Sequence, residues 1–253
     1  MKRRHYHFAA SLVLGLWLGV GPQAAERDPQ ALGALQAMGK YLHGLSHFTL
    51  AADSETDQTL DTGQVVEFHH RTDVLVVQPD KLHVSVQQPT SARQFFYDGK
   101  QFALYDGQYG YYTNGPAPAT IDALLDEINA RYGIELPLAD LFRWSTTTAD
   151  EVGISDALVI GDERLNGYTC THYAYRQPDV DWQLWVRKGA APLPCRLVIS
   201  RRDVPERPRH SVDFEWDLEH APATGSFAFV PPANAHQVPL QRLAVPGREE
   251  AQP

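Results

Sequence analysis

Apolar and polar residues alternate along most of the chain, which predicts a protein built mainly of β-strands. The run Val212-Asp213-Phe214-Glu215-Trp216-Asp217-Leu218 alternates strictly, with an acidic residue at every second position, and residues 81–87 follow the same period. This pattern is typical of an antiparallel sheet that has one buried face and one face in water. Similar runs predict strands at about 48–54, 64–78, 81–87, 151–161, 167–176, 181–188, 194–202, 210–219 and 227–230.

Two similar phrases, Phe96-Tyr97-Asp98-Gly99 and Leu104-Tyr105-Asp106-Gly107, predict tight turns. Asp-Gly between aromatic runs is a strong hairpin signal because Gly accepts the positive φ that such turns require. Residues 94–114 are therefore expected to form three short antiparallel strands. Asp98 and Asp106 are then turn residues and not catalytic acids.

The segment after Asp28-Pro29 has the period of a helix. Its apolar residues recur at steps of three and four from Leu32 to Leu42, and Gly44 is expected to end the helix.

A second helix is expected in the middle of the chain, where Thr120 can cap its first turn and Gly133 suits its end. Its apolar residues lie on one helical face: Ile121, Leu124, Leu125, Ile128 and Tyr132. A short apolar piece at 136–142 follows directly. Because a lone helix between strands must cover one face of the sheet, we interpret these two segments as a lid. Whether the space beneath is hollow or filled by aromatic side chains stays open.

The N-terminus has the features of a signal peptide. Lys2, Arg3 and Arg4 precede an apolar stretch at 8–20, and Ala24-Ala25 offers a cleavage site. The apolar stretch is short for a bilayer span of about 20 residues, and no later segment is apolar enough to cross a membrane. We expect a signal peptide at 1–25, a single exported domain at 26–240 and a disordered tail at 241–253.

The charge balance bears on the partners. The chain has 22 basic and 31 acidic residues, a net charge of −9, and without Lys2, Arg3 and Arg4 the net charge is 19 − 31 = −12. Nucleic acids and anionic membranes both require clustered Lys and Arg. The composition therefore argues against both as primary partners.

The two cysteines, Cys170 and Cys195, favour one disulfide in an exported protein. In a simple meander, however, they lie on strands separated by a third. With neighbouring strands about 4.8 Å apart, their Cα atoms would exceed the usual limit of about 7 Å. A strand end that folds over, or another strand order, would allow the bond; otherwise the cysteines are two separate buried thiols.

No motif nominates a catalytic residue, a metal site or a cofactor, so we do not expect an enzyme. His43 and His47 have helical ligand spacing, but Gly44 should end the helix between them. A nucleophile made of His172 and Cys195 would need a reduced thiol in an oxidising compartment. A secreted hydrolase remains a distant third hypothesis.

Five motifs resemble a domain-of-unknown-function family of predicted periplasmic proteins, which is similar in fold to the lipoprotein carriers LolA and LolB and to the mycobacterial protein LppX. They are Tyr97-Asp98-Gly99-Lys100, Leu136-Pro137-Leu138-Ala139-Asp140, Asp181-Trp182-Gln183-Leu184-Trp185, Pro192-Leu193-Pro194-Cys195 and Phe227-Ala228-Phe229-Val230-Pro231-Pro232. The resemblance implies a mainly β (α+β) fold of LolA type. In that fold, helices close the concave side of a curved antiparallel half-barrel, which can hold acyl chains.

The leading hypothesis is a periplasmic binding or carrier protein for a hydrophobic molecule, such as a lipid or an acyl chain. Alternating positions nominate these residues for the lining of its cavity: Leu82, Val84, Val86, Phe102, Leu104, Leu124, Ile128, Leu141 and Phe142. The alternative is a protein-interaction module, such as an envelope-stress sensor, in which the same fold engages a partner protein and holds no small ligand.

Overall fold

The computed structural model describes residues 27–88, 91–139 and 150–241. The expected signal peptide, Leu141 and Phe142 of the expected lining, and the tail from residue 242 lie outside the described residues.

One twelve-stranded sheet organises the described chain, in the order β12-β6-β5-β4-β3-β2-β1-β11-β10-β9-β8-β7. All described pairings of its strands are antiparallel except that of β12 with β6. The strands are β1 (His47–Thr59), β2 (Val65–Val77), β3 (Lys81–Gln88), β4 (Ser91–Tyr97), β5 (Gln101–Asp106), β6 (Tyr111–Pro116), β7 (Asp156–Leu165), β8 (Tyr168–Arg176), β9 (Val180–Arg187), β10 (Pro194–Arg201), β11 (Arg209–Asp217) and β12 (His236–Gln237).

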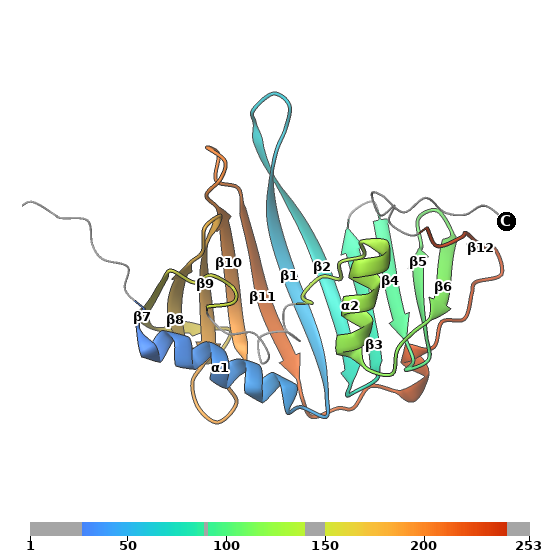
Figure 1. Cartoon of the computed structure of the whole chain (residues 1–253), viewed down its shortest axis with the longest axis horizontal. Helices are drawn as coiled ribbons and strands as arrows, with labels where there is room; N and C mark the ends of the chain where they lie inside the picture. Colours follow the sequence, from blue (N-terminus) through green and yellow to red (C-terminus); the bar gives the residue numbers. More distant parts are fainter. Residues whose placement is uncertain (1–26, 89–90, 140–149, 242–253) are drawn as a thin grey trace, which may run out of the picture.

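The sheet consists of two meanders that meet at β1. Strands β1 to β6 form one, strands β7 to β11 form the other, and β11 pairs with β1 from Thr49↔Asp217 to Thr56↔His210. This long-range pairing makes one continuous, curved sheet (Figure 1). The expected mainly β, antiparallel, open curved architecture is confirmed.

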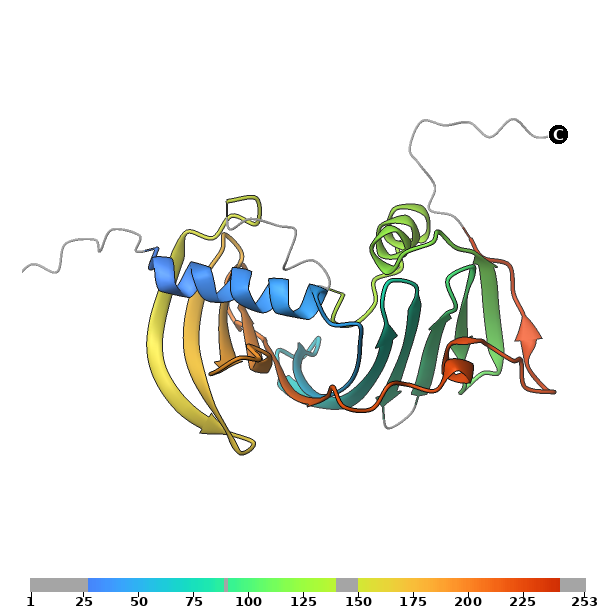
Figure 2. The same ribbon diagram turned by 90° about the horizontal axis from the view of Figure 1, so that it is seen from below.

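Two helices cover the concave face. Figure 2 shows α1 (Pro29–His43) and α2 (Ile121–Tyr132) on the same side, with α1 over the β7–β11 half and α2 over the β3–β6 half. Side chains of both helices and of both halves of the sheet form one hydrophobic cluster. In α2, Ile121, Leu124, Leu125 and Ile128 are all buried, and each stabilises the helix on the sheet by roughly 1.5–3 kcal/mol.

The helix boundaries follow the sequence signals. The Asp28 carboxylate accepts the Gln30 N–H at 2.7 Å, and the Thr120 hydroxyl accepts the Ala123 N–H at 3.3 Å. Gly133 ends α2 in the left-handed conformation at φ 64°, which glycine adopts without the steric penalty of a Cβ. Tyr175 ties α1 to the sheet, because its buried hydroxyl donates to the Ala31 carbonyl at 2.9 Å.

Both Asp-Gly phrases lie in turns, but the positive φ expected at Gly107 is found at Gly110 instead, at 68°. Asp98 accepts N–H groups from Lys100 and Gln101 at 2.9 and 2.8 Å, and Gly99 has a φ of 88°. Asp106 accepts the N–H groups of Gln108 and Tyr109 in the same way. Both carboxylates therefore shape turns.

The predicted strand at 227–230 is wrong. The segment is a short 3-10 helix (Thr224–Phe227) followed by extended chain. Phe229 packs against Phe96, Tyr105 and Tyr112, with ring centroids 5.2–5.6 Å apart. Phe227 is buried as well. The alternation of aromatic residues therefore reflects burial, although residues 227–230 form no strand.

The predicted strand at 151–161 is displaced, since β7 starts only at Asp156 and continues to Leu165. Gly153 adopts a φ of 71° in the turn that precedes it. A left-handed residue cannot continue an extended strand, so the ladder begins after it.

Cys170 and Cys195 form a disulfide, with Cα atoms 6.8 Å apart. The strands form the expected meander, and the bond crosses the end of β9, where Cys170 lies opposite Arg187. The β9–β10 register shifts between Pro194 and Arg196, which places Cys195 in an irregularity. This local distortion brings the cysteines together, and the alternative of two separate thiols is wrong.

Replacing both Cys170 and Cys195 with serine is expected to lower the free energy of unfolding by about 3 kcal/mol, because the crosslink restricts the unfolded chain. Urea denaturation measures the change, and the reduced wild-type protein is the control that retains both sulfur atoms. A double variant with the same unfolding free energy as the oxidised wild type would contradict this account.

Candidate functional site

A cavity of about 430 Å³ lies on the concave face, between the β2–β5 part of the sheet and the segment that follows α2. Its lining comprises His70, Val84, Val86, Gln88, Ser91, Arg93, Gln94, Phe95, Leu104, Gly133, Ile134, Glu135, Leu136 and Pro137. Ligand cavities typically measure about 300–1,000 Å³ and have mainly apolar walls with a few polar groups. The size and mixed lining fit a small amphipathic molecule.

The apolar floor comes from neighbouring strands in register. Val84 of β3 lies opposite Phe95 of β4, and Phe95 lies opposite Leu104 of β5. Val86 is two residues further along β3, so it points to the same face as Val84. Strand alternation thus places these four apolar side chains together across the concave face.

Polar side chains line another part of the cavity. Ser91 donates to Gln88 at 3.0 Å, and the Arg93 guanidinium pairs with Asp106 at 3.3 Å. Glu135 accepts a hydrogen bond from Asn129 at 3.2 Å. Arg93 is largely exposed, so a ligand held on the apolar floor can keep a polar group near this side chain and in water.

The segment 133–139 separates this cavity from a smaller one of about 210 Å³. Ile134, Glu135 and Leu136 line both hollows. The segment is held to α2 by the Ile134 N–H, which donates to the Ile128 carbonyl at 3.2 Å, and Leu138 has a φ of 61°. With space on two sides, it is packed less completely than α2.

The nine expected lining residues separate into three groups. Val86 and Leu104 line the cavity and are partly buried, and Val84 borders it although it is only 3% exposed and belongs to the core cluster. Leu82, Phe102, Leu124 and Ile128 are at most 2% exposed and belong to the core. Leu141 and Phe142 lie outside the described residues.

Several lining residues were not nominated from the sequence. Phe95 lies on the same face of its strand as Tyr97, two residues on, so the strand period indicates that it is buried. Ile134 and Leu136 follow α2 in irregular chain, where no period marks a face. His70 belongs to no motif that distinguishes it from other polar strand residues.

His70 and His210 form a neutral pair beside the cavity. Their rings stack at 6.0 Å, and His210 also contacts the Thr56 hydroxyl at 2.7 Å. Burial and the neighbouring His69 lower the pKa of His70, and burial and His70 lower the pKa of His210. Both imidazoles therefore stay uncharged at neutral pH.

A third hollow, of about 530 Å³, lies between the end of α1, the β2–β3 turn and the start of α2. Its lining is mixed: His43, Gly44, Leu45, Ser46, Gln78, Pro79, Thr120, Ile121 and Asp122. It lacks the row of apolar strand residues that forms the floor of the first cavity.

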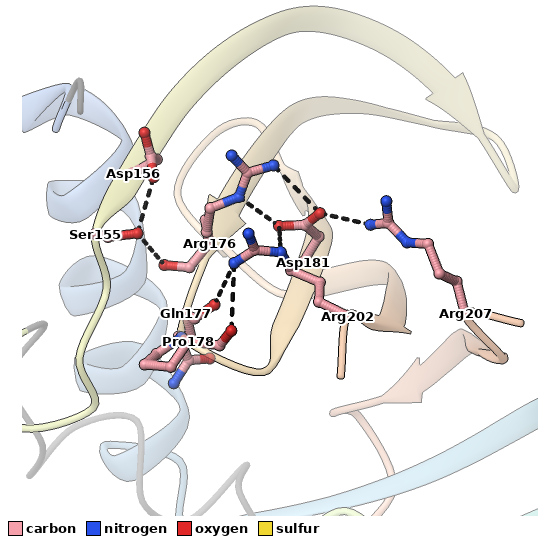
Figure 3. Close-up of polar contacts among 8 residues, drawn as sticks. All are labelled: Ser155, Asp156, Arg176, Gln177, Pro178, Asp181, Arg202 and Arg207. Carbon is pink, nitrogen blue, oxygen red and sulfur yellow. Dashed lines mark hydrogen bonds and ion pairs between the residues drawn. The ribbon is translucent and has the colours of Figure 1, made fainter. Parts of the chain in front are cut away.

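Figure 3 shows three arginines converging on Asp181. Arg176 and Arg207 each approach its carboxylate at 2.7 Å and Arg202 at 3.5 Å, while Arg202 also donates to the Gln177 carbonyl at 3.0 Å. The hydrogen bond from Arg176, above all, lowers the pKa of Asp181. All three arginines form ion pairs with this carboxylate, and these ion pairs connect the β8–β9 turn to the β10–β11 loop. We interpret the cluster as structural.

The thiol that a His172–Cys195 nucleophile requires is absent, because Cys195 is in the disulfide. His172 stacks on Trp185 at 3.9 Å. Within residues 27–88, 91–139 and 150–241, no three His, Cys, Asp or Glu side chains gather as a metal site. No helix in the same ranges has the length and apolar character needed to span a membrane.

Several solved structures resemble this chain at low sequence identity. LprF from Mycobacterium bovis is 12% identical with a TM-score of 0.43, covering 84% of this chain and 100% of that chain. The MucA/MucB complex of Pseudomonas aeruginosa is 12% identical in sequence with a TM-score of 0.43, and the match covers 79% of this chain and 61% of that chain. A LolA superfamily protein from Nitrosomonas europaea is 12% identical with a TM-score of 0.36, and the match covers 79% of this chain and 97% of that chain.

A family model gives the more specific match. Residues 31–241 match the family described as "Predicted periplasmic protein (DUF2092)", whereas no curated protein matches the chain. The description agrees with the periplasmic location expected from the sequence. The chain therefore belongs to this family of predicted periplasmic proteins.

Proposed function

We propose that this protein binds a hydrophobic or amphipathic molecule, such as a lipid with one acyl chain, in the concave cavity. The cavity itself carries the proposal: an apolar floor from three adjacent strands lies beneath the segment 133–139, with Gln88, Ser91 and Arg93 also in its lining. The acyl chain would lie on Val84, Val86 and Leu104, and the polar group would lie near Arg93.

The size of the hydrophobic effect makes such binding feasible. Each buried methylene group contributes about 0.8 kcal/mol, so eight of them would contribute roughly 6 kcal/mol before the loss of translational freedom is subtracted. Polar contacts near Arg93 would select the headgroup more than they would add affinity.

Binding accounts for the lining better than catalysis does. The titratable side chains of the cavity are His70, Arg93 and Glu135. Among the described residues, these side chains have structural partners, namely His210, Asp106 and Asn129. A hydrolase needs a nucleophile or an activated water beside a base, and these contacts supply neither.

The segment 133–139 supports a carrier role, because a carrier must release its ligand. Leu136 lies between the two hollows, so movement of this segment would join them and widen the access to the floor. A protein-interaction module without a small ligand is the alternative, and uptake of a lipid probe separates the two.

Val86→Trp is expected to weaken binding of a fluorescent fatty-acid probe by roughly tenfold or more, because the indole displaces at least two methylene groups at about 0.8 kcal/mol each. Probe fluorescence during titration measures the affinity. Val152→Trp is the matched control, since Val152 is exposed and lies outside the cavity.

The control is expected to bind as the wild type does. Equal affinity of Val86→Trp and Val152→Trp, or no uptake by the wild-type protein, would contradict binding at this cavity.

Acidification from pH 7.5 to 5 is expected to weaken probe binding, because protonation of His70 and His210 brings positive charge to the apolar cavity wall. The pKa values of His70 and His210 lie below the usual 6.5. The two imidazoles therefore become protonated, and positively charged, only when the pH falls below that value. In the unfolded chain the same histidines have the higher, usual pKa and so bind protons at a higher pH than in the folded protein. The free energy of unfolding therefore also falls as the pH is lowered through this range.

His70→Gln is expected to flatten this profile, whereas His43→Gln, at an exposed residue outside the cavity, retains it. Titrations at each pH, with tryptophan fluorescence to verify folding, measure the effect. Parallel profiles for His70→Gln and the wild type would refute a role for His70.

A further inference from the structure

The β1–β2 hairpin extends beyond the rest of the sheet as a two-stranded ribbon (Figure 1). Pairing of β1 with β11 ends at Thr56, and pairing of β2 with β3 begins at Arg71. Residues 57–70, named here the distal ribbon, therefore pair with no strand other than β1 and β2 among the described residues. At its base, the backbone N–H of Arg209 donates to the Asp57 carboxylate at 3.0 Å.

The distal ribbon exposes large apolar side chains. Leu60, Val65, Val66 and Phe68 are 37–48% exposed. Val66 and Phe68 alternate with Glu67 along β2, so they point to one face and Glu67 to the other. A ribbon of β-branched and aromatic residues with water around it is costly unless another chain covers it.

The sheet protects its outer strands but leaves this edge open. β12 pairs with β6, and the β7–β8 register is interrupted between Val159 and Gly161. In contrast, β2 from Val65 to His70 is regularly paired with β1 and has no proline, lysine or bulge on its free side. Natural sheets use such devices, and charged side chains, to prevent strand addition. Between Val65 and His70 the one Asp, Glu, Lys or Arg side chain is that of Glu67.

The charge of the distal ribbon specifies the chemistry of a partner. Asp57 lies directly opposite Glu67, and like charges at such positions destabilise a strand pair. No Lys or Arg occurs between Asp57 and His70, and Arg71 already pairs with Asp53 and Asp73. A cation beside Glu67 would relieve this repulsion.

We propose that the free edge of β2 binds an extended segment of a partner protein in which apolar and basic residues alternate. Its backbone adds a strand beside Val65–His70, its apolar side chains cover Val66 and Phe68, and a basic side chain pairs with Glu67. Strand addition supplies the affinity through main-chain hydrogen bonds, and the alternating side chains supply the specificity.

A protein segment suits this surface better than two other occupants. An anionic membrane requires basic residues, which the distal ribbon does not have. A second copy of this chain would bring together two molecules that each carry a net charge of −12 without the three N-terminal basic residues (19 − 31), which opposes association.

The experiment uses a fluorescently labelled octapeptide of alternating valine and lysine, titrated with the full-length mature protein and followed by anisotropy. Glu67→Lys is expected to weaken binding by roughly tenfold or more. The same change places a lysine opposite Asp57, so the melting temperature should not fall. Glu219→Lys is the matched control, because Glu219 is exposed and follows β11, whose end pairs with the opposite end of β1.

Two further peptides test the mode of binding. A peptide of the same composition with its valines and lysines in separate blocks, and one with alternate backbone nitrogens methylated, should both bind at least about tenfold more weakly if main-chain pairing carries the affinity. Hydrogen exchange at Val65–His70 should slow when the alternating peptide is bound.

The proposal is overturned if the wild type does not bind the alternating peptide, if both lysine variants lose equal affinity, or if the methylated peptide binds as tightly. Sedimentation with phosphatidylcholine vesicles that depends on Val66 and Phe68 would assign the distal ribbon to a lipid surface instead. A dimer in sedimentation velocity that Glu67→Lys dissociates would assign it to a second copy.

Discussion

The pairing of β1 with β11 is the constraint on which the rest of the structure depends. It joins residues about 160 positions apart, from Thr56↔His210 to Thr49↔Asp217, and turns two meanders into one curved sheet. Because both meanders present their apolar residues to the same side, the joined sheet has one concave apolar face. Ala52 of β1 and Phe214 of β11 are opposite each other there and are buried.

The concave face is larger than two helices can cover, and the candidate site follows from this mismatch. α1 packs over one half and α2 over the other, and the described residues that follow Gly133, 134–139, contain no helix or strand. A cavity is left where Val84, Val86 and Leu104 face that segment. On the other side, the disulfide lies in a small separate cluster with Trp185 and Val198, and Phe229 packs against β4–β6.

Local features of the fold could be predicted because their causes are local. Asp28, Thr120 and Gly133 fix helix ends through contacts within a few residues, and Asp98 and Asp106 do the same for turns. The β1–β11 register, by contrast, depends on contacts between distant residues that no period reveals. The Phe227-Ala228-Phe229 pattern was misinterpreted for a related reason: alternation shows that a face is buried, but not whether a strand or a separate segment covers it.

The site could be predicted only in part, for the same physical reason. Leu124 and Val84 both belong to apolar faces and to one buried cluster, yet Val84 also borders the cavity and Leu124 does not. Periodicity indicates burial and is silent about empty space, and Ile134 and Leu136 lie in chain with no period at all. The unpaired Val65–His70 edge likewise becomes visible only when its neighbours are known to stop at Thr56 and Arg71.

Native mass spectrometry tests the central claim most directly, with mature protein purified without detergent and measured before and after extraction with organic solvent. The account predicts an additional mass that extraction removes and that a single-chain lipid restores with one-to-one stoichiometry. A mass unchanged by extraction, together with no uptake of the added lipid, would contradict it.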